Sequence, residues 1–317
     1  MNISEEVPPA LKSNTIQQAS QNGNGPFPLR MFFGHHKCAT GWIDNILREI
    51  CLHMGISFKI VHQPYSFEQY GTLGPLVKQE KLQFLSYINT DLRYTHDLEV
   101  YRAFHVVRDP RDIVVSAYFS HLHSLKAPTW DELNTLRDKL SGLSKEEGLF
   151  FELEYLQDQF RRMGEWDYNQ DHILEIKMEE LSADPVGKFQ EILEFMEMFD
   201  PEERAGLGLK MRNMRLKMNR LNHKGRRFMP GKMPIFMVPK RPLYTFPRVA
   251  LQEVTEKLSF KRMAGGRKKG EENIKSHYRK GVHGDWKNHL NDDHIAYFKT
   301  HYNDLLIKLG YEEDGNW

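Results

Sequence analysis

Short apolar runs alternate along this chain with segments in which apolar residues recur at helical spacing. The run from Leu29 to Phe33 ends in Gly34 and is typical of a buried strand. A short loop follows, and apolar side chains then recur every three or four residues from Trp42 to Met54, which predicts a helix that Gly55 ends. This part of the chain therefore predicts a strand, a loop and a helix in that order.

The same alternation continues along the chain. Further strands are predicted at residues 57–61, 82–88, 103–107 and 172–177, and further helices at residues 112–123, from 184 onward and at 292–309. Strands that are apolar on both faces and are separated by helices form parallel sheets covered on each side. We therefore expect an α/β fold with a parallel sheet between two layers of helices.

Composition narrows the class of protein. Of the 317 residues, 40% are hydrophobic and 12% aromatic, which is enough for a sizeable core. No apolar run approaches the roughly 18 residues that cross a bilayer. Residues 1–28, rich in Ser, Asn, Gln and Pro, are expected to be a disordered tail and not a secretory signal. Because Cys38 and Cys51 are the only cysteines, a disulfide framework is excluded and we expect a cytoplasmic protein.

Charge is unevenly distributed along the chain. In total, 44 Lys and Arg stand against 43 Asp and Glu, for a formal net charge of +1. Residues 131–203, however, carry 21 acidic and 7 basic side chains, whereas residues 204–250 carry 13 basic ones and no acidic one. Residues 204–250 also hold six of the 14 methionines, and the basic stretch extends to residue 270. Two interpretations stay open: a solvated surface segment, or a basic wall over an anionic ligand with Met supplying adaptable apolar contacts.

The first candidate phosphate site is the loop between the first strand and its helix. Lys37 lies in this loop, and Thr40 and Gly41 begin the helix. A helix N-terminus offers unpaired backbone N–H groups and a partial positive charge, both of which suit a phosphate. Lys37 adds a point charge and Thr40 a hydroxyl. The loop is not a Walker A motif, because it contains no Gly-Lys-Ser/Thr.

A second candidate begins at Arg108, directly after the strand predicted at residues 103–107. Open α/β sheets bind ligands at the carboxyl ends of their strands. Ser116, about one turn into the following helix, can face the same anion. An alternative stays open in which Arg108 and Asp112 form a structural ion pair, although this alternative leaves Ser116 unexplained.

The third candidate is the segment from Arg279 to Asn288, which reads Arg-Lys-Gly-Val-His-Gly-Asp-Trp-Lys-Asn. Two adjacent cations followed by two glycines are typical of a flexible basic loop whose backbone can approach a phosphate closely. The chain therefore contains three candidate phosphate contacts in widely separated segments.

Together these segments resemble sulfotransferases that use 3′-phosphoadenosine 5′-phosphosulfate (PAPS). The 5′-phosphosulfate loop of that family reads Pro-Lys-Ser-Gly-Thr-Thr-Trp, and residues 36–42 here read His-Lys-Cys-Ala-Thr-Gly-Trp. Cys38, Ala39 and Gly41 replace Ser, Gly and Thr, so this loop relies more on backbone donors. Met178 replaces the aromatic residue that opens the family's Tyr-Glu-Asp-Leu-x-x-Asp-Pro motif.

The resemblance implies a role for each matched residue. Lys37 would contact the 5′-phosphate and the bridging oxygen and stabilise charge on the leaving phosphate, while Thr40 and the loop amides hold that phosphate. Trp42 would stack near the adenine, and Arg108 and Ser116 would bind the 3′-phosphate. The implied nucleotide-binding residues are Lys37, Cys38, Ala39, Thr40, Gly41, Trp42, Arg108, Ser116, Met178, Arg279, Lys280 and Gly281.

The base that would take the acceptor's proton is left open between two residues. Many family members have Lys-Thr-His at the end of the third strand, whereas residues 89–91 here are Asn-Thr-Asp. Asp91 and His96 are the nearest catalytic candidates, and His62 and Glu68 follow. A carboxylate can serve as the base if burial raises its pKa.

Other partners are judged from the remaining motifs. No metal is expected, since the His pairs at 121 and 123 and at 289 and 294 lack a third ligand at suitable spacing. The dimerisation segment of the family is not matched after Lys287, so the oligomeric state stays open. No nucleic-acid partner is expected, and peripheral contact with a membrane is left open.

These observations predict one sulfotransferase domain over residues 29–317, with 204–270 as a basic, Met-rich elaboration on the substrate side. Its fold would be α/β, with a P-loop-like parallel β-sheet flanked by helices on both faces. It would move the sulfuryl group of PAPS by in-line displacement to a hydroxyl or amine of a small-molecule, lipid or carbohydrate acceptor and release adenosine 3′,5′-bisphosphate. Two alternatives stay open: a P-loop-type kinase and a non-catalytic polyanion-binding protein.

Overall fold

A computed structural model describes residues 28–62, 64–124, 131–200, 210–211, 213–215, 217–219, 221, 243 and 245–317. The tail predicted at residues 1–28 lies outside this description except for its last residue. In the basic stretch predicted at 204–270, most of residues 204–244 also lie outside it.

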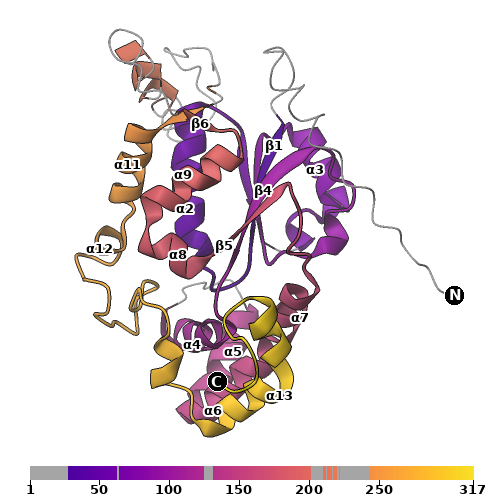
Figure 1. The fold of residues 1–317 in the computed structure, drawn as a ribbon, viewed down its shortest axis with the longest axis vertical. Coiled ribbons are helices and arrows are strands. Elements are labelled where there is room, and N and C mark those ends of the chain that lie inside the picture. The colour runs from indigo at the N-terminus through magenta and orange to yellow at the C-terminus, as the bar shows by residue number, and fades with distance from the viewer. Residues whose placement is uncertain are drawn as a thin grey trace, which may run out of the picture.

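A five-stranded parallel sheet forms the centre of the described molecule (Figure 1). In chain order its strands are β1 (Leu29–Gly34), β2 (Phe58–Val61), β3 (Phe84–Ile88), β4 (Tyr101–Val107) and β5 (Ile173–Lys177). Their order across the sheet is β2-β3-β1-β4-β5, and every neighbouring pair is parallel. All residues of the central strand β1 are buried, because helices cover both of its faces. The predicted strands and the parallel sheet are confirmed.

Helices and short turns connect these strands. Before β4 the chain forms α2 (Thr40–Met54), η1 (Pro64–Ser66), η2 (Glu68–Tyr70), α3 (Leu73–Glu80) and η3 (Leu92–Tyr94). Between β4 and β5 it forms α4 (Pro110–Phe119), the π-helical turn η4 (Ser120–Ser124), α5 (Asp131–Ser141), α6 (Lys145–Tyr155) and α7 (Gln157–Glu165). After β5 come α8 (Met178–Ala183), α9 (Pro185–Phe195), β6 (Phe199–Asp200), β7 (Phe246–Pro247), α11 (Arg248–Lys257), α12 (Phe260–Met263), η5 (Asp285–Asn288) and α13 (Asp292–Lys308). None of these described helices has the length and hydrophobicity needed to span a bilayer.

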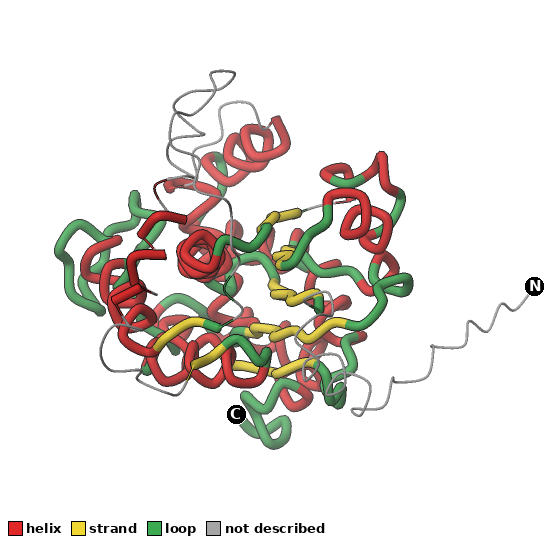
Figure 2. The backbone as a smooth tube through the Cα atoms, turned by 90° about the horizontal axis from the view of Figure 1, so that it is seen from above, coloured by secondary structure: helices red, strands yellow, loops and turns green. Residues whose placement is uncertain are grey.

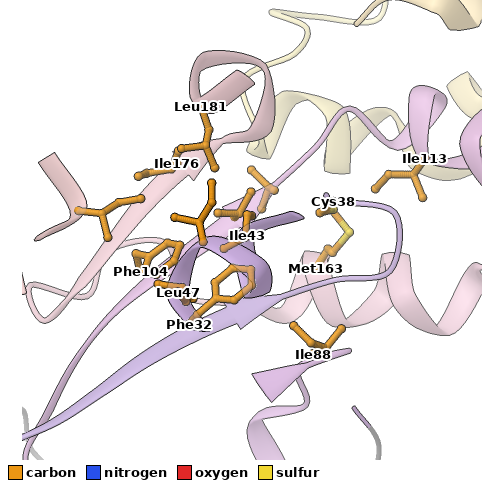
Figure 3. Close-up of a cluster of buried hydrophobic side chains, with 14 of the residues drawn as sticks. Phe32, Cys38, Ile43, Leu47, Ile88, Phe104, Ile113, Met163, Ile176 and Leu181 are labelled. Atoms are coloured by element: carbon orange, nitrogen blue, oxygen red, sulfur yellow. The ribbon is translucent and has the colours of Figure 1, made fainter. Parts of the chain in front are cut away.

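The helices lie on both sides of the sheet, as predicted. Figure 1 shows α2, α8 and α9 on one side and α3 on the other, while α4, α5, α6 and α13 gather at the end where β4 leads into α4. Seen from above in Figure 2, the strands run between the helices. The larger buried cluster contains Phe32, Leu47 and Phe104 (Figure 3). The smaller one contains Phe33 and Trp166, because alternate residues of β1 point to opposite faces.

The segment from residue 245 to 263 belongs to the helical layer on the α2 side. β7 pairs in parallel with β6, and α11 packs against α2 and α9. Leu251 of α11 is fully buried in the larger cluster. This part of the predicted substrate-side elaboration therefore contributes to the core of the fold, a role that its high content of basic residues concealed.

Candidate active site

The loop between β1 and α2, residues 35–39, turns sharply because two of its residues adopt left-handed backbone conformations. The φ angle is 66° at Lys37 and 57° at Ala39. The Lys37 carbonyl accepts a hydrogen bond from Nη1 of Arg108 at 3.0 Å, and the His36 carbonyl accepts one from Nε2 of Gln159 at 3.0 Å. Side chains that follow β4 and that belong to α7 therefore fix the shape of this loop.

Helix α2 begins directly after the loop and has no side-chain cap. Its N-cap residue is Ala39, whose carbonyl accepts hydrogen bonds from the backbone N–H groups of Trp42 and Ile43. Within the described part of the chain, the backbone N–H groups of Thr40 and Gly41 have no partner. Unpaired N–H groups and the helix dipole both favour an anion. The geometry therefore suits the phosphate that the sequence predicts here.

Cationic side chains from three segments, Lys37, Arg108 and Arg279, influence one another electrostatically near the start of α2. Burial, together with the Arg108 guanidinium, lowers the pKa of Lys37 to about 7, and Arg279 acts in the same direction. Arg108 is buried, and its Nε has no partner among the residues that the structure describes. The three predicted phosphate contacts are thus brought together, and their mutual repulsion is relieved by an anion placed among them.

The basic C-terminal segment, residues 277–288, which includes the third candidate motif, folds over the loop between β1 and α2. A Cβ atom built on Gly41 would lie 3.8 Å from Nε2 of His277, so this segment covers the start of α2. The buried carboxylate of Asp285 holds Arg279 and Lys280. Its Oδ2 lies 2.5 Å from Nη2 of Arg279, and its Oδ1 lies 2.5 Å from Nζ of Lys280. Burial by itself would raise the pKa of Asp285, but hydrogen bonds from Lys280 and Arg279 hold it well below its usual range. Asp285 therefore stays charged and fixes both cations.

Asp112 of α4 anchors the same segment. Its carboxylate accepts hydrogen bonds from the backbone N–H groups of Gly284 at 2.7 Å and Trp286 at 3.0 Å. Among the described residues, Asp112 forms no ion pair with Arg108, so the structural alternative for the second motif is wrong.

The predicted start of that helix at residue 112 is also wrong. α4 begins at Pro110, and Asp109 is its N-cap, with its carboxylate accepting from the N–H of Arg111 at 2.9 Å. The fixed φ of Pro110 suits a first helical position, which places the cap on the residue before it.

The remaining predicted nucleotide contacts lie on α2, α4 and α8 and in the loop before α2. Ser116 lies half-buried on α4, and Met178 begins α8 and packs against the larger core. Trp42 donates from Nε1 to the Leu258 carbonyl at 2.8 Å, which ties α2 to the end of α11. Cys38 is buried in the core (Figure 3), and burial raises the pKa of its thiol to about 12. Cys38 therefore serves packing, and its sulfur stays neutral.

The two predicted bases lie in and beside η3. Asp91 is the N-cap of η3 and is bound in a bidentate ion pair by Arg93, with Oδ2 and Nη2 2.6 Å apart. These hydrogen bonds lower the pKa of Asp91, contrary to the expectation that burial raises it. Both carboxylate oxygens of Asp91 thus accept hydrogen bonds from Arg93. His96 is exposed, and its Nδ1 lies 3.0 Å from the Arg93 carbonyl.

A pocket beside Asp91 does not extend to the cations of the predicted phosphate site. It is lined by residues 90–93 and by Arg161, Arg162, Glu165 and Trp166. Neither Lys37 nor Arg108 belongs to this lining. His62 and Glu68, the other candidate bases, are exposed.

One chain of buried polar side chains, which the sequence does not predict, ends on the loop at His36. Oε1 of Glu152 in α6 lies 2.8 Å from Nδ1 of His121, and Nε2 of His121 lies 2.9 Å from Nε2 of His36. Glu152 and His121 are buried. His36 and His121 are 85 positions apart, so spacing along the sequence gives no signal of this contact.

A second chain of the same composition ends on the preceding residue. Oε2 of Glu175 in β5 lies 2.7 Å from Nδ1 of His105, and Nε2 of His105 lies 2.9 Å from Nε2 of His35. His35 is fully buried, and its Nδ1 has no partner within the described residues. The adjacent pair of histidines before Lys37 is the one local signal that could have pointed to these chains.

Three residues near the basic segment have the composition of a metal site. Ligand atoms of Glu272, Asp285 and His289 lie within 4.8 Å of one another. Arg279 already donates hydrogen bonds to both carboxylates, and Lys280 donates to Asp285. We therefore assign this cluster the role of orienting the two cations.

Comparison with known proteins follows from this geometry. The model of the sulfotransferase domain family matches residues 99–226 and 243–310, more than half of the chain. These ranges include the segments that carry Arg108, Ser116, Arg279 and Lys280. No curated protein sequence matches the chain.

Similar solved structures include a mouse sulfotransferase complexed with PAP, with 13% identity over 88% of this chain and 84% of that chain and a TM-score of 0.43. Retinol dehydratase in complex with androsterone and inactive cofactor PAP has 13% identity over 88% and 82% of the two chains and a TM-score of 0.43. A sulfotransferase domain from the curacin biosynthetic pathway has 12% identity over 73% and 98% and a TM-score of 0.31. On the strength of the family match, this chain belongs to the sulfotransferase domain family, which confirms the resemblance of its motifs.

Proposed function

We propose that this protein transfers the sulfuryl group of PAPS to a hydroxyl or amine acceptor by in-line displacement and releases adenosine 3′,5′-bisphosphate. The observation that carries the proposal is the convergence of Lys37, Arg108 and Arg279 on the uncapped start of α2. PAPS carries phosphates at both its 3′ and its 5′ position, so one molecule can bind cations that come from separate segments of the chain. Membership of the sulfotransferase domain family supports the same reaction.

The proposed role of Lys37 follows from its place in the loop. The N–H groups of Thr40 and Gly41 hold the 5′-phosphate, and Lys37 reaches the oxygen that bridges this phosphate and the sulfuryl group. Negative charge grows on that oxygen as the bond to sulfur breaks. A fixed cation at this oxygen stabilises the transition state more than the ground state, which is the main source of catalysis in such transfers.

The remaining residues position the donor. We propose that Arg108, Ser116, Arg279 and Lys280 bind its 3′-phosphate, and that Trp42 and Met178 line the side of the nucleotide base. Asp285 holds Arg279 and Lys280 in place before the donor arrives, and Asp112 holds the backbone that follows them, at Gly284 and Trp286. Such preorganisation reduces the entropy lost on reaching a reactive geometry.

We further propose one catalytic domain over residues 29–317 and a cytoplasmic location. α11 packs on α2, and α13 packs on α7, which supports one unit that includes the C-terminal segments. Cys38 and Cys51 are unpaired and buried, as is usual in a reducing compartment. The acceptor would be a small molecule, a lipid or a carbohydrate.

Calorimetry with adenosine 3′,5′-bisphosphate, ADP and ATP tests the donor. We expect the bisphosphate to bind most tightly and Lys37→Ala to weaken its binding by about 10- to 100-fold, the value of a hydrogen bond to a charged group. Lys188→Ala is the control, because Lys188 pairs only with surface carboxylates of α8 and α9 in the described chain. Preference for ATP would support a kinase instead, and binding of heparin without binding of any nucleotide would support a polyanion-binding protein.

A screen of hydroxyl and amine acceptors with PAPS tests the transfer itself. Each product is expected to gain the mass of one sulfuryl group, and Lys37→Ala should abolish this gain. Consumption of PAPS that Lys37→Ala leaves at the wild-type rate would contradict the proposed role of Lys37.

A further inference from the structure

We propose that His36 is the catalytic base of this transfer, and that His121 and Glu152 are positioning residues that hold its imidazole ready to accept a proton at Nδ1. The inference rests on the proposed sulfuryl transfer and adds the residue that receives the acceptor's proton. It replaces Asp91 and His96, the two bases that the sequence suggests.

The order of hydrogen bonds determines the protonated nitrogen in each ring. In the proposed arrangement Glu152 accepts a hydrogen bond from Nδ1 of His121, 2.8 Å away, so this nitrogen carries a hydrogen. Nε2 of His121 then presents a lone pair, and the hydrogen between the two rings belongs to Nε2 of His36, 2.9 Å away. The lone pair of His36 is therefore left on Nδ1. This is the arrangement of a base whose orientation a buried carboxylate controls through a second group.

Burial makes this arrangement rigid. Glu152 and His121 are 0% and 1% exposed, and the rings of His121 and His36 are nearly parallel, at 10°, with centroids 5.1 Å apart. His36 is half-buried, and its Nδ1 has no hydrogen-bond partner among the described residues. His121 lies in the π-helical turn η4 after α4, an irregularity that is frequent at functional sites. The chain thus has a buried carboxylate at one end and an unpaired imidazole nitrogen at the other.

His36 lies beside the proposed donor site. It directly precedes Lys37, the residue proposed to contact the oxygen that leaves the sulfuryl group. Burial lowers the pKa of His36 well below its usual value, and Lys37 and His121 act in the same direction. His36 is therefore neutral at pH 7 and able to accept a proton. Glu152, which contacts His121, also acts electrostatically on Lys37.

In the proposed step the acceptor's O–H or N–H bond breaks and its proton moves to Nδ1 of His36. The acceptor atom forms a bond to sulfur while the bond between sulfur and the bridging oxygen breaks, and that electron pair leaves on the 5′-phosphate beside Lys37. The imidazolium of His36 then donates through Nε2–H to His121, whose other nitrogen faces Glu152. The proton passes to solvent after the products leave, and no redox change occurs.

His35 provides a matched control within the same loop. It ends a chain of the same composition through His105 and Glu175, with the same 2.9 Å separation between Nε2 atoms. Unlike His36, it is 0% exposed, and its Nδ1 is enclosed by protein. No acceptor can reach this nitrogen, so His35 should support the fold without entering the reaction.

Nitrogen-15 NMR of the histidine side chains tests the geometry without any acceptor. At pH 7 we expect His36 to be neutral with its hydrogen on Nε2, and His121 to carry its hydrogen on Nδ1. The signals are assigned from their loss in His36→Gln and His121→Gln. An imidazolium, or a hydrogen on Nδ1 of His36, at pH 7 would overturn the proposal.

Turnover tests the chemistry, with PAPS and the acceptor found by the mass-shift screen. His36→Gln keeps a donor toward His121 and removes the base, so kcat should fall at least 100-fold, a typical contribution of general-base catalysis. Affinity for adenosine 3′,5′-bisphosphate should stay within about twofold, since the cations are unchanged. The controls His35→Gln and His96→Gln should keep kcat within about threefold. A His36→Gln enzyme with near wild-type kcat, or an Asp91→Asn enzyme that alone loses turnover, would refute the proposal.

Chemical rescue and pH dependence separate a base from a structural residue. Added imidazole should restore turnover to His36→Ala and leave the wild-type rate unchanged. Glu152→Gln removes a negative charge that favours the imidazolium, so the acid limb of the pH–rate profile should move to lower pH while the plateau rate falls. An unmoved acid limb, with only an overall loss of protein stability, would show that Glu152 is purely structural. Failure of the wild type to bind the bisphosphate would instead count against the proposed function.

Discussion

Lys37 is the residue whose protonation should change most when an anion binds. Its pKa of about 7 in the free protein means that about half of the Lys37 side chains are neutral at pH 7. A phosphate beside it restores the pKa upward, so binding takes up protons, and affinity falls as pH rises above 7. Calorimetry in buffers of different ionisation enthalpy measures this uptake.

Lys37→Arg is the control for that prediction. Arg stays charged across the whole range, so its proton uptake should lack the contribution of Lys37 and its affinity should depend less on pH. Equal proton uptake by the two proteins would contradict the assignment of the lowered pKa to Lys37.

Ala39 is strained by its backbone conformation. Its φ of 57° lies in the left-handed region, where a Cβ costs about 1–2 kcal/mol. Gly has more conformational freedom than Ala in the unfolded chain, which offsets part of the relief of strain. Ala39→Gly should therefore raise the free energy of unfolding by about 0.5–1 kcal/mol. Ala250→Gly, in the right-handed helix α11, should lower it by a similar amount. Urea denaturation compares the two, and a loss of stability in Ala39→Gly would contradict the strain.

The sequence predicts the place in the site of some residues and not of others. Lys37, Arg108 and Arg279 could be predicted, because each occupies a segment whose pattern shows where its backbone lies. The contacts of His36 could not, because its partners come from α4–α6 and meet it only after the sheet has formed. Asp91 was expected to be a base, but Arg93 lies two positions away and holds its carboxylate.

Among the elements, the basic C-terminal segment depends most on a single close packing contact. Gly281 has a φ of 69°, and a Cβ there would lie 2.5–2.8 Å from atoms of the Phe260 ring. Gly281→Ala should therefore displace Arg279 and Lys280 and weaken binding of adenosine 3′,5′-bisphosphate by at least about 10-fold. Calorimetry measures the loss.

Gly284 is the control for this contact. Its φ is 72°, but no atom lies within 4 Å of a Cβ built on it. Gly284→Ala therefore carries the backbone strain without the collision and should lose less affinity than Gly281→Ala. In the background of Phe260→Ala, the difference between the two glycine substitutions should shrink, whereas an unchanged difference would contradict the packing argument.

The sequence predicts helices and strands most closely where burial determines their residues. β1 and β4 are apolar on both faces, which in an α/β protein suffices to place them in the centre of a parallel sheet. The start of α4 was misplaced because Asp109 and Asp112 both suit an N-cap, and only Pro110 decides between them. α11 went unpredicted because its buried face is short and its neighbours in sequence are basic.

At the scale of the molecule, Arg111 joins parts of the chain that are distant in sequence. It is buried, forms ion pairs with Asp109 and with Glu312, and lies 4.1 and 4.5 Å from the ring centroids of Trp286 and Trp317. Loss of Arg111 would leave the Asp109 carboxylate buried without an opposing charge, with only the backbone N–H of residue 111, among the described groups, still donating to it. We expect Arg111→Ala to lower the free energy of unfolding by about 3–5 kcal/mol, measured by urea denaturation.

Arg161 offers a matched comparison, since it also pairs with two carboxylates, Asp158 and Glu165, but on the surface. Solvent screens such pairs, so Arg161→Ala should leave the unfolding midpoint close to that of the wild type. Similar losses of stability in the two variants would contradict the role assigned to the burial of Arg111.

The two histidine chains on consecutive residues have a kinetic consequence. His35 is anchored to β4 and His36 to η4, so the peptide between them is held from two separate parts of the protein. A loop restrained in this way has little freedom left to lose when a ligand arrives, and no slow reordering needs to precede binding. Encounter with a doubly phosphorylated nucleotide should then be set by diffusion and by attraction to the cluster of cations. The association rate constant should consequently fall steeply as ionic strength rises, while the dissociation rate constant changes little.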